Sequence, residues 1–333
     1  GRSRDKAAAF AGRVKDAAHP VDYHAFDITE GLPLQAIKPD MVIHTSGPFQ
    51  QQGYAVARAC IEYGCHYLDL ADGRDFVAGI RILNDPARAR GVSVISGASS
   101  VPCLSSAVID HYKPEFSRLE SLDYGITTAQ QTNRGLATTA AILGYVGKPF
   151  RTLIGGRMRD IYGWQDIHAH DYPEFGRRLL GNCDIPDLDL LPDYYSDLKD
   201  IRFYAGTEIA TLHFGLWLLS WAVRAGVVRS LKPAAKIFLK MARTCDGLGS
   251  GNSAFHMTMG GQDNTGRPKT KTLYILARDG HGPYIPCAPA IILTKRLLRN
   301  EMQHPGAYPC IGLVDLDSYM AALAGLNIRK LEM

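Results

Sequence analysis

Short apolar segments alternate with helix-like segments between residues 41 and 113, and this alternation constrains the fold more than any other feature. Strands are predicted over 41–44, 66–71 and 92–95, with helical periodicity between them. Strands that are apolar throughout are typical of a parallel sheet whose two faces are both covered by helices. The order of the segments therefore predicts an α/β fold built on a doubly wound parallel sheet.

Three polar residues, Arg2, Ser3 and Lys6, lie at the start of the first predicted helix. In a nucleotide-binding βαβ unit, the residue that closes the second strand contacts the adenosine ribose, and an arginine there binds a 2′-phosphate. We therefore predict that these residues bind the ribose phosphate of NADP, with a solvated chain end as the alternative. A strand is predicted over 21–26, and Asp27 after it either accepts a hydrogen bond from the adenine amino group or starts a turn.

The predicted strand 41–44 is followed by a turn made of Thr45, Ser46, Gly47, Pro48 and Phe49. Ligands of open α/β sheets bind beyond the carboxyl ends of the strands. Glycine at position 47 leaves room for a ligand to approach the backbone closely. We therefore expect this turn to contact the ribose and nicotinamide of a dinucleotide, the alternative being an ordinary turn without a ligand.

The turn at 45–49, the helix through 56–60 and the segment 64–70 resemble the nucleotide-binding domain of the saccharopine dehydrogenase-like NAD(P)-binding oxidoreductases. The likeness runs to about residue 101 and resumes near 286–290 and 306–316. The middle of the chain is more similar to bacterial members of unassigned substrate. The resemblance implies a Rossmann-like, doubly wound N-terminal domain that binds a nicotinamide dinucleotide, followed by an α+β domain that supplies the substrate pocket.

On this basis we expect a partial dinucleotide-binding domain over 1–115 and a substrate or dimerisation domain over 116–288. A C-terminal helical segment over 289–333 is expected to return to the first domain. The family's glycine-rich pyrophosphate loop, which belongs to the first βαβ unit, is not in this sequence. We therefore expect the chain to be an N-terminally truncated fragment that lacks this unit.

The resemblance implies hydride transfer to or from a carbonyl, imine or enoyl small molecule, with NADP as cofactor and NAD as the open alternative. A non-catalytic dinucleotide-binding or lipid-associated scaffold of the same fold is the competing hypothesis. Asp72 follows the strand 66–71 and is a candidate for proton transfer. His281 lies in a glycine-flanked turn and is a second candidate, because histidine titrates near neutral pH.

Ser99, Ser100 and Arg134 are the candidate substrate-binding residues. Both serines lie in a turn that opens a predicted helix, where free N–H groups can bind a carboxylate or carbonyl oxygen. Arg134 precedes another predicted helix and suits bidentate binding of a carboxylate. As alternatives, the two serines cap the predicted helix, and the arginine is exposed to solvent without a ligand.

The composition excludes several other classes of protein. The net charge of +4 is too small and too scattered to favour nucleic-acid binding. The seven cysteines form no Cys-x-x-Cys pair and no histidine-rich ligand pattern. They predict reduced thiols of a cytoplasmic protein rather than a disulfide framework or a metal site.

The most apolar stretch of the chain, residues 209–228, contains two tryptophans and Arg224. An arginine inside a bilayer span is costly, so a buried or interface helix is expected ahead of a membrane-facing one. This helix could keep apolar surface that the rest of the chain does not cover. Such surface would indicate either a homodimer that forms through this helix or contact with a membrane.

Overall fold

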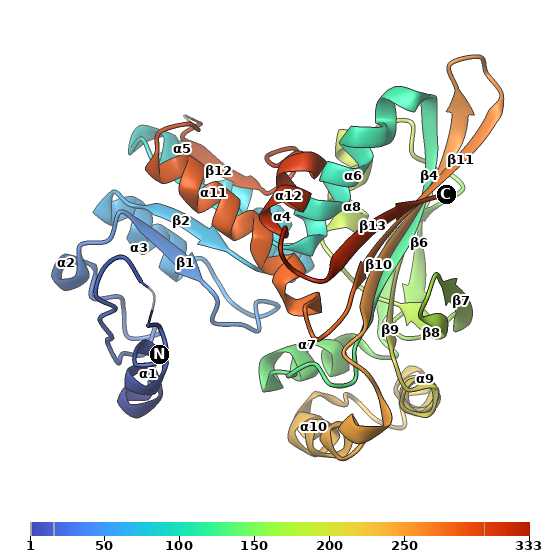
Figure 1. Cartoon of the computed structure of the whole chain (residues 1–333), viewed down its shortest axis with the longest axis horizontal. Helices are drawn as coiled ribbons and strands as arrows, with labels where there is room; N and C mark the ends of the chain where they lie inside the picture. Colours follow the sequence, from blue (N-terminus) through green and yellow to red (C-terminus); the bar gives the residue numbers. More distant parts are fainter. Residues whose placement is uncertain (1, 16, 303) are drawn as a thin grey trace.

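The computed structural model describes residues 2–15, 17–302 and 304–333, which form two sheets with helices around them (Figure 1). The first sheet has four parallel strands in the order β1-β2-β3-β12. The bounds are β1 (Met41–His44), β2 (His66–Asp69), β3 (Ser93–Ser96) and β12 (Gly306–Pro309). The predicted strands of the first domain that begin at residues 41, 66 and 92 therefore form one parallel sheet.

Helices cover both faces of this sheet. On β2 and β3, Tyr67 and Val94 pack in a core cluster with α3 (Ala55–Tyr63), whereas Leu68 and Ile95 pack with α11 (Ala288–Leu298). Neighbouring residues of a strand point to opposite faces, so both faces need apolar side chains. This is why the central residues of β2 and β3 are apolar and why the sheet is doubly wound, as predicted.

The helices that connect the strands follow the predicted order, but with more breaks. The predicted helix over 75–90 consists of α4 (Arg74–Gly79), a 3-10 turn (Ile80–Leu83) and α5 (Asn84–Ala89). The helix after β3 begins with an irregular turn (Ser100–Leu104) and continues as α6 (Ser105–Tyr112).

The predicted strand at 21–26 is wrong, because residues 21–27 form no strand and lie on the surface between α1 (Arg4–Ala11) and α2 (Leu34–Ile37). In a doubly wound sheet this strand would pair with a strand that ends just before α1. Arg2 and Ser3, the residues that directly precede α1, are not in a strand. Without a neighbouring strand, its backbone groups have no partners in the sheet. β1 is consequently the edge of the first sheet.

The second sheet has seven strands in the order β13-β11-β10-β4-β9-β8-β7, of which only β4 and β9 pair in parallel. The bounds are β4 (Phe116–Thr128), β7 (His168–Tyr172), β8 (Gly176–Asn182), β9 (Asp200–Thr207), β10 (Ser253–Asp263), β11 (Pro268–Ala277) and β13 (Ile328–Glu332). A separate hairpin consists of β5 (Pro149–Ile154) and β6 (Arg157–Tyr162). The helices of this part are α7 (Leu136–Tyr145), α8 (Asp187–Tyr194), α9 (Ala210–Arg224) and α10 (Ala235–Thr244). The fold is thus a Rossmann-like domain with a second α+β domain.

The C-terminal part of the chain contributes to both sheets. α11 and β12 belong to the first sheet, and α12 (Leu316–Ala322) packs against α11 and α6. β13 then pairs with β11 at the edge of the second sheet. We propose the division at residues 115 and 288 as the domain boundaries, with β13 tying the end of the chain to the second domain.

The apolar segment 209–228 contains α9, which packs against β8 and β9 and buries His213 and Ser220. α9 is 15 residues long. Within the ranges that the structure describes, no helix has the length and apolar character to span a bilayer.

Candidate functional site

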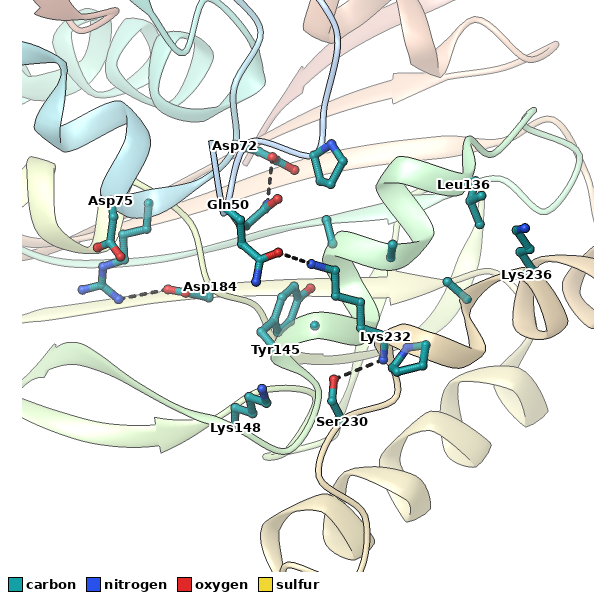
Figure 2. Close-up of a pocket in the computed structure, with 18 residues that line it drawn as sticks. Gln50, Asp72, Asp75, Leu136, Tyr145, Lys148, Asp184, Ser230, Lys232 and Lys236 are labelled. Carbon is teal, nitrogen blue, oxygen red and sulfur yellow. Dashed lines mark hydrogen bonds and ion pairs between the residues drawn. The ribbon is translucent and has the colours of Figure 1, made fainter. Parts of the chain in front are cut away.

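A cavity of about 960 Å³ lies between the two domains, beyond the carboxyl ends of β1 and β2 (Figure 2). One wall comes from the loops that follow these strands, with Pro48, Gln50, Gln51, Asp72, Arg74 and Asp75. The other wall comes from the second domain. It consists of α7, Asp184, and the segment that leads from Ser230 into the start of α10. The position is the one where open α/β sheets bind ligands.

Asp69, the last residue of β2, holds the loops at this edge of the sheet. Its side chain is fully buried, and its Oδ1 accepts hydrogen bonds from Gly97 N at 2.7 Å, Ser96 Oγ at 2.9 Å and Ala71 N at 3.0 Å. Burial raises the pKa of Asp69 to about 6, and the three donors oppose that rise. One carboxylate oxygen therefore fixes the ends of both β2 and β3.

The two loops of this wall pack backbone against backbone. A Cβ at Gly73 would lie 3.2 Å from both the Gln50 nitrogen and the Phe49 carbonyl carbon, so only glycine fits without a shift. The Phe49 ring is buried, with its centroid 5.2 Å from that of Phe76. Gln52 Nε2 donates to the carbonyl oxygens of Ser46 at 2.6 Å and Pro48 at 3.0 Å, which fixes the turn after β1.

Asp72 faces the cavity from this wall and accepts a hydrogen bond from Gln50 Nε2 at 3.1 Å (Figure 2). Asp72 is exposed at the cavity, but the protein packed around it desolvates the charged form and raises the pKa of Asp72 above the ordinary value, with the Gln50 bond acting in the opposite direction. A carboxyl group with a raised pKa at a cavity wall is suited to proton transfer.

Arg74 joins the two domains beside the cavity. Its guanidinium forms ion pairs with Asp189 and, at 3.0 Å, with Asp184, and it donates to the Arg151 carbonyl oxygen at 2.8 Å. Its side chain is only 11% exposed. All three partners belong to the second domain, so this one side chain fixes the distance between the two walls.

The opposite wall carries a tyrosine and three lysines. Tyr145, at the end of α7, lies with its hydroxyl oxygen 3.0 Å from Cys183 Sγ. Burial raises the pKa of Tyr145 well above its ordinary value, so the phenol keeps its proton at neutral pH. The lysines are Lys148, Lys232 and Lys236. Lys232 Nζ crosses the cavity to donate to Gln51 Oε1 at 2.7 Å (Figure 2).

The residues predicted to bind the adenosine end lie together, but outside the residues that line the cavity. Arg2 and Asp27 form an ion pair at 3.8 Å, and the Arg2 side chain is 82% exposed. Ser3 caps α1, its Oγ accepting from Lys6 N at 3.3 Å. Asp27 accepts two hydrogen bonds from Thr29, as expected if this residue starts a turn. These bonds lower the pKa of the Asp27 carboxyl.

The predicted nicotinamide turn borders the cavity. Pro48 lines the cavity. Thr45 and Ser46 are exposed, Gly47 is half-buried, and Phe49 packs in the core. The turn therefore offers backbone and small side chains at the sheet edge, next to the cavity.

The other predicted residues do not line the cavity, and two of them, His281 and Arg134, have partners elsewhere. His281 Nδ1 accepts from Asn327 N at 2.8 Å. Arg134 forms an ion pair with Asp246 and donates to Gln130 Oε1 at 3.1 Å. At Ser99, no side-chain hydrogen bond caps the turn that follows, so the capping alternative for this serine finds no support in the structure. Ser100, in the same turn, also lies outside the cavity wall.

Sequence reasoning missed most of the cavity wall that the second domain supplies: Tyr145, Lys148, Asp184, Lys232 and Lys236. Lys232 and Lys236 are spaced by one helical turn. This spacing is the one local signal that could have predicted the two lysines on a common surface. Among the described residues, no group of three or more His, Cys, Asp and Glu side chains is arranged to hold a metal ion.

No protein-family model matches this chain, and no curated protein matches it. Among solved structures, it is similar to the apo form of histidine-tagged saccharopine dehydrogenase (L-Glu forming) from Saccharomyces cerevisiae. The TM-score is 0.63 at 12% identity, over 93% of this chain and 89% of that chain. An amine dehydrogenase from Mycobacterium smegmatis gives a TM-score of 0.27 at 11% identity, over 52% of this chain and 60% of that chain, which carries no argument. The chain therefore has the fold of saccharopine dehydrogenase, as the sequence resemblance predicts.

Proposed function

We propose that this protein is an NADP(H)-dependent oxidoreductase that transfers hydride to or from a carbonyl, imine or enoyl small molecule. The observation that carries this proposal is the cavity of about 960 Å³ between the domains, at the carboxyl ends of β1 and β2. A cavity at that edge, walled by protonatable side chains, favours an enzyme over a non-catalytic scaffold. The similar fold of saccharopine dehydrogenase supports the same class of reaction.

The residues present fit a nicotinamide dinucleotide at two places. The exposed Arg2 guanidinium forms a long ion pair with Asp27, at 3.8 Å, and this exposure leaves it accessible to a 2′-phosphate. The turn from Thr45 to Pro48 presents open backbone next to the cavity, where Gly47 leaves room for a ring. The bound nicotinamide would supply or accept the hydride.

The chain's own residues would position the substrate and move the proton. Asp72, with its raised pKa, is the proposed proton donor and acceptor from one wall. Tyr145 holds a proton on its hydroxyl at the other wall. Lys148 and Lys236 make this second wall positive, which favours anionic groups on the substrate. The ion pairs of Arg74 keep the two walls at a fixed separation.

The cofactor assignment predicts that this protein binds NADPH more tightly than NADH. Arg2→Ala should weaken NADPH binding by about tenfold or more, since a charge-assisted contact to phosphate is lost, and should leave NADH binding unchanged. Calorimetric titration of both cofactors measures this. Arg13→Ala, an exposed arginine just beyond α1, is the matched control. Equal weakening of both cofactors would contradict the 2′-phosphate assignment, and binding of neither would favour the scaffold.

Gly47→Val should weaken cofactor binding by about tenfold or more while leaving the melting temperature nearly unchanged. A Cβ at Gly47 meets only Phe49, at 3.6 Å or more, so the fold accepts a side chain there and the added bulk projects towards the proposed cofactor. Gly53→Val is the control, because a Cβ at Gly53 meets no atom within 4 Å. An unchanged dissociation constant for Gly47→Val would place the cofactor away from this turn.

A further inference from the structure

The end of the second domain that carries α9 and α10 exposes large apolar side chains. On α9, Phe214, Leu218 and Trp221 are 47%, 52% and 45% exposed. On α10, Ile237 and Met241 are 63% and 55% exposed. Both helices lie at the lower edge of the second domain in Figure 1, and the start of α10 borders the cavity. We call these five side chains the apolar face.

Each helix presents its exposed apolar residues as a stripe. The α9 residues follow the spacing i, i+4, i+7, and the α10 residues the spacing i, i+4, so each set lies on one side of its helix. The Phe214 and Trp217 rings stack with centroids 5.0 Å apart, which fixes part of the face. Scattered single apolar residues need no explanation, whereas a stripe on each of two successive helices indicates a contact surface.

The segment that carries the apolar face has cations and no acidic residue, and Glu208 and Asp246 flank it. Between residues 209 and 245 the chain has six Lys or Arg residues and no Asp or Glu. Arg224 is held over the Tyr162 ring at 3.8 Å and Lys232 is bound to Gln51. The remaining four are exposed and make no salt bridge within the described part of the chain. Lys236 lines the cavity, which leaves three cations for the apolar face: Arg229, Lys240 and Arg243.

This charge decides between the possible occupants of the face. A twofold dimer places the same patch on both sides of the interface, which would bring these cations together without any acidic residue to pair with them. A membrane with anionic lipids accepts the apolar side chains and attracts the cations at the same time. On α10, Lys240 and Arg243 lie beside Ile237 and Met241 in the sequence of the helix, so their stems can lie along the acyl boundary with the charges at the headgroups.

We propose that α9 and α10 form a peripheral binding surface for anionic membranes, with both helices lying in the plane of the interface. This proposal does not depend on the proposed hydride transfer, since it uses a surface outside the cofactor-binding turn. It predicts that the protein binds vesicles of 30% phosphatidylglycerol in phosphatidylcholine and releases them at high salt, because screening weakens the attraction of the cations. Pure phosphatidylcholine vesicles should bind weakly.

Vesicle co-sedimentation and tryptophan emission test the proposal together. The emission of the exposed Trp221 should shift to shorter wavelength on binding and be quenched by brominated acyl chains. Ile237→Ser with Met241→Ser, and separately Lys240→Glu with Arg243→Glu, should each weaken binding by about tenfold or more. The matched controls are Ile82→Ser with Ile291→Ser, which are 62% and 50% exposed elsewhere, and Arg58→Glu with Lys295→Glu.

Three outcomes would overturn the proposal. The first is no binding to the anionic vesicles, and the second is binding that the α10 variants leave unchanged. The third is a dimer in sedimentation equilibrium that Ile237→Ser with Met241→Ser converts to a monomer, which would assign the face to a second copy of this chain. Since all substituted side chains are exposed, an unchanged melting temperature should accompany each result and exclude unfolding as the cause.

Discussion

Arg74→Ala should lower the free energy of unfolding by about 2–4 kcal/mol, which is a large fraction of the stability of a typical protein. The substitution removes the only guanidinium that the structure places between Asp184 and Asp189, and leaves these two carboxylates close together without a counter-charge. It also leaves the Arg151 carbonyl oxygen without this donor. Chemical denaturation of wild type and variant at neutral pH measures the difference.

Two further variants separate the ion pairs from simple loss of packing. Arg74→Lys keeps the charge but cannot form the forked contact to Asp189, so it should recover only part of the lost stability. In a double-mutant cycle, Asp189→Asn should be much less harmful in the Arg74→Ala background than in wild type. Independent, additive effects of the two substitutions would contradict the proposed coupling of the domains through this side chain.

The first sheet could be predicted from the sequence because its signal is local. The strand at 41–44 has the predicted bounds, and β2 and β3 begin within one residue of the prediction. A strand buried on both faces needs apolar side chains at its central positions, and this property is visible in the sequence without knowledge of its neighbours. The strand predicted at 21–26 failed for the complementary reason, because forming a strand also needs a pairing partner.

The candidate site was harder to predict because its walls come from distant segments. Their positions after strands predict Asp72 and the turn at 45–49 as site residues, by a rule that uses only the local order of elements. Tyr145 and Lys236 face them from a second domain, and nothing in their own neighbourhood indicates this. His281 and Arg134 were chosen for their chemistry, but both are hydrogen-bonded to residues about 46 and 112 positions away.

Asp69→Ala should destabilise the protein by about 3–5 kcal/mol, because it leaves Gly97 N, Ala71 N and the Ser96 hydroxyl buried without their acceptor. Asp69→Asn should be far milder at neutral pH. All three donors bind the same oxygen, Oδ1, and the asparagine carbonyl can take its place. If Asp69→Asn is as harmful as Asp69→Ala, the negative charge and not the acceptor geometry holds the loops together.

The pH dependence of these variants gives an independent check. The pKa of Asp69 is about 6 in the folded protein, against 3.8 for an ordinary aspartate, and burial is the main cause. Between these values the folded state keeps a proton that the unfolded chain has released, so the contribution of Asp69 to stability falls as the pH rises from about 4 to about 6. Asparagine does not titrate. Relative to Asp69→Asn, wild type should therefore lose up to about 3 kcal/mol over this range and change little above pH 7. Unfolding free energies at pH 4.5 and 7.5 test this, and a difference between the two proteins that stays constant or changes in the opposite direction would show that Asp69 is ionised in the folded state throughout.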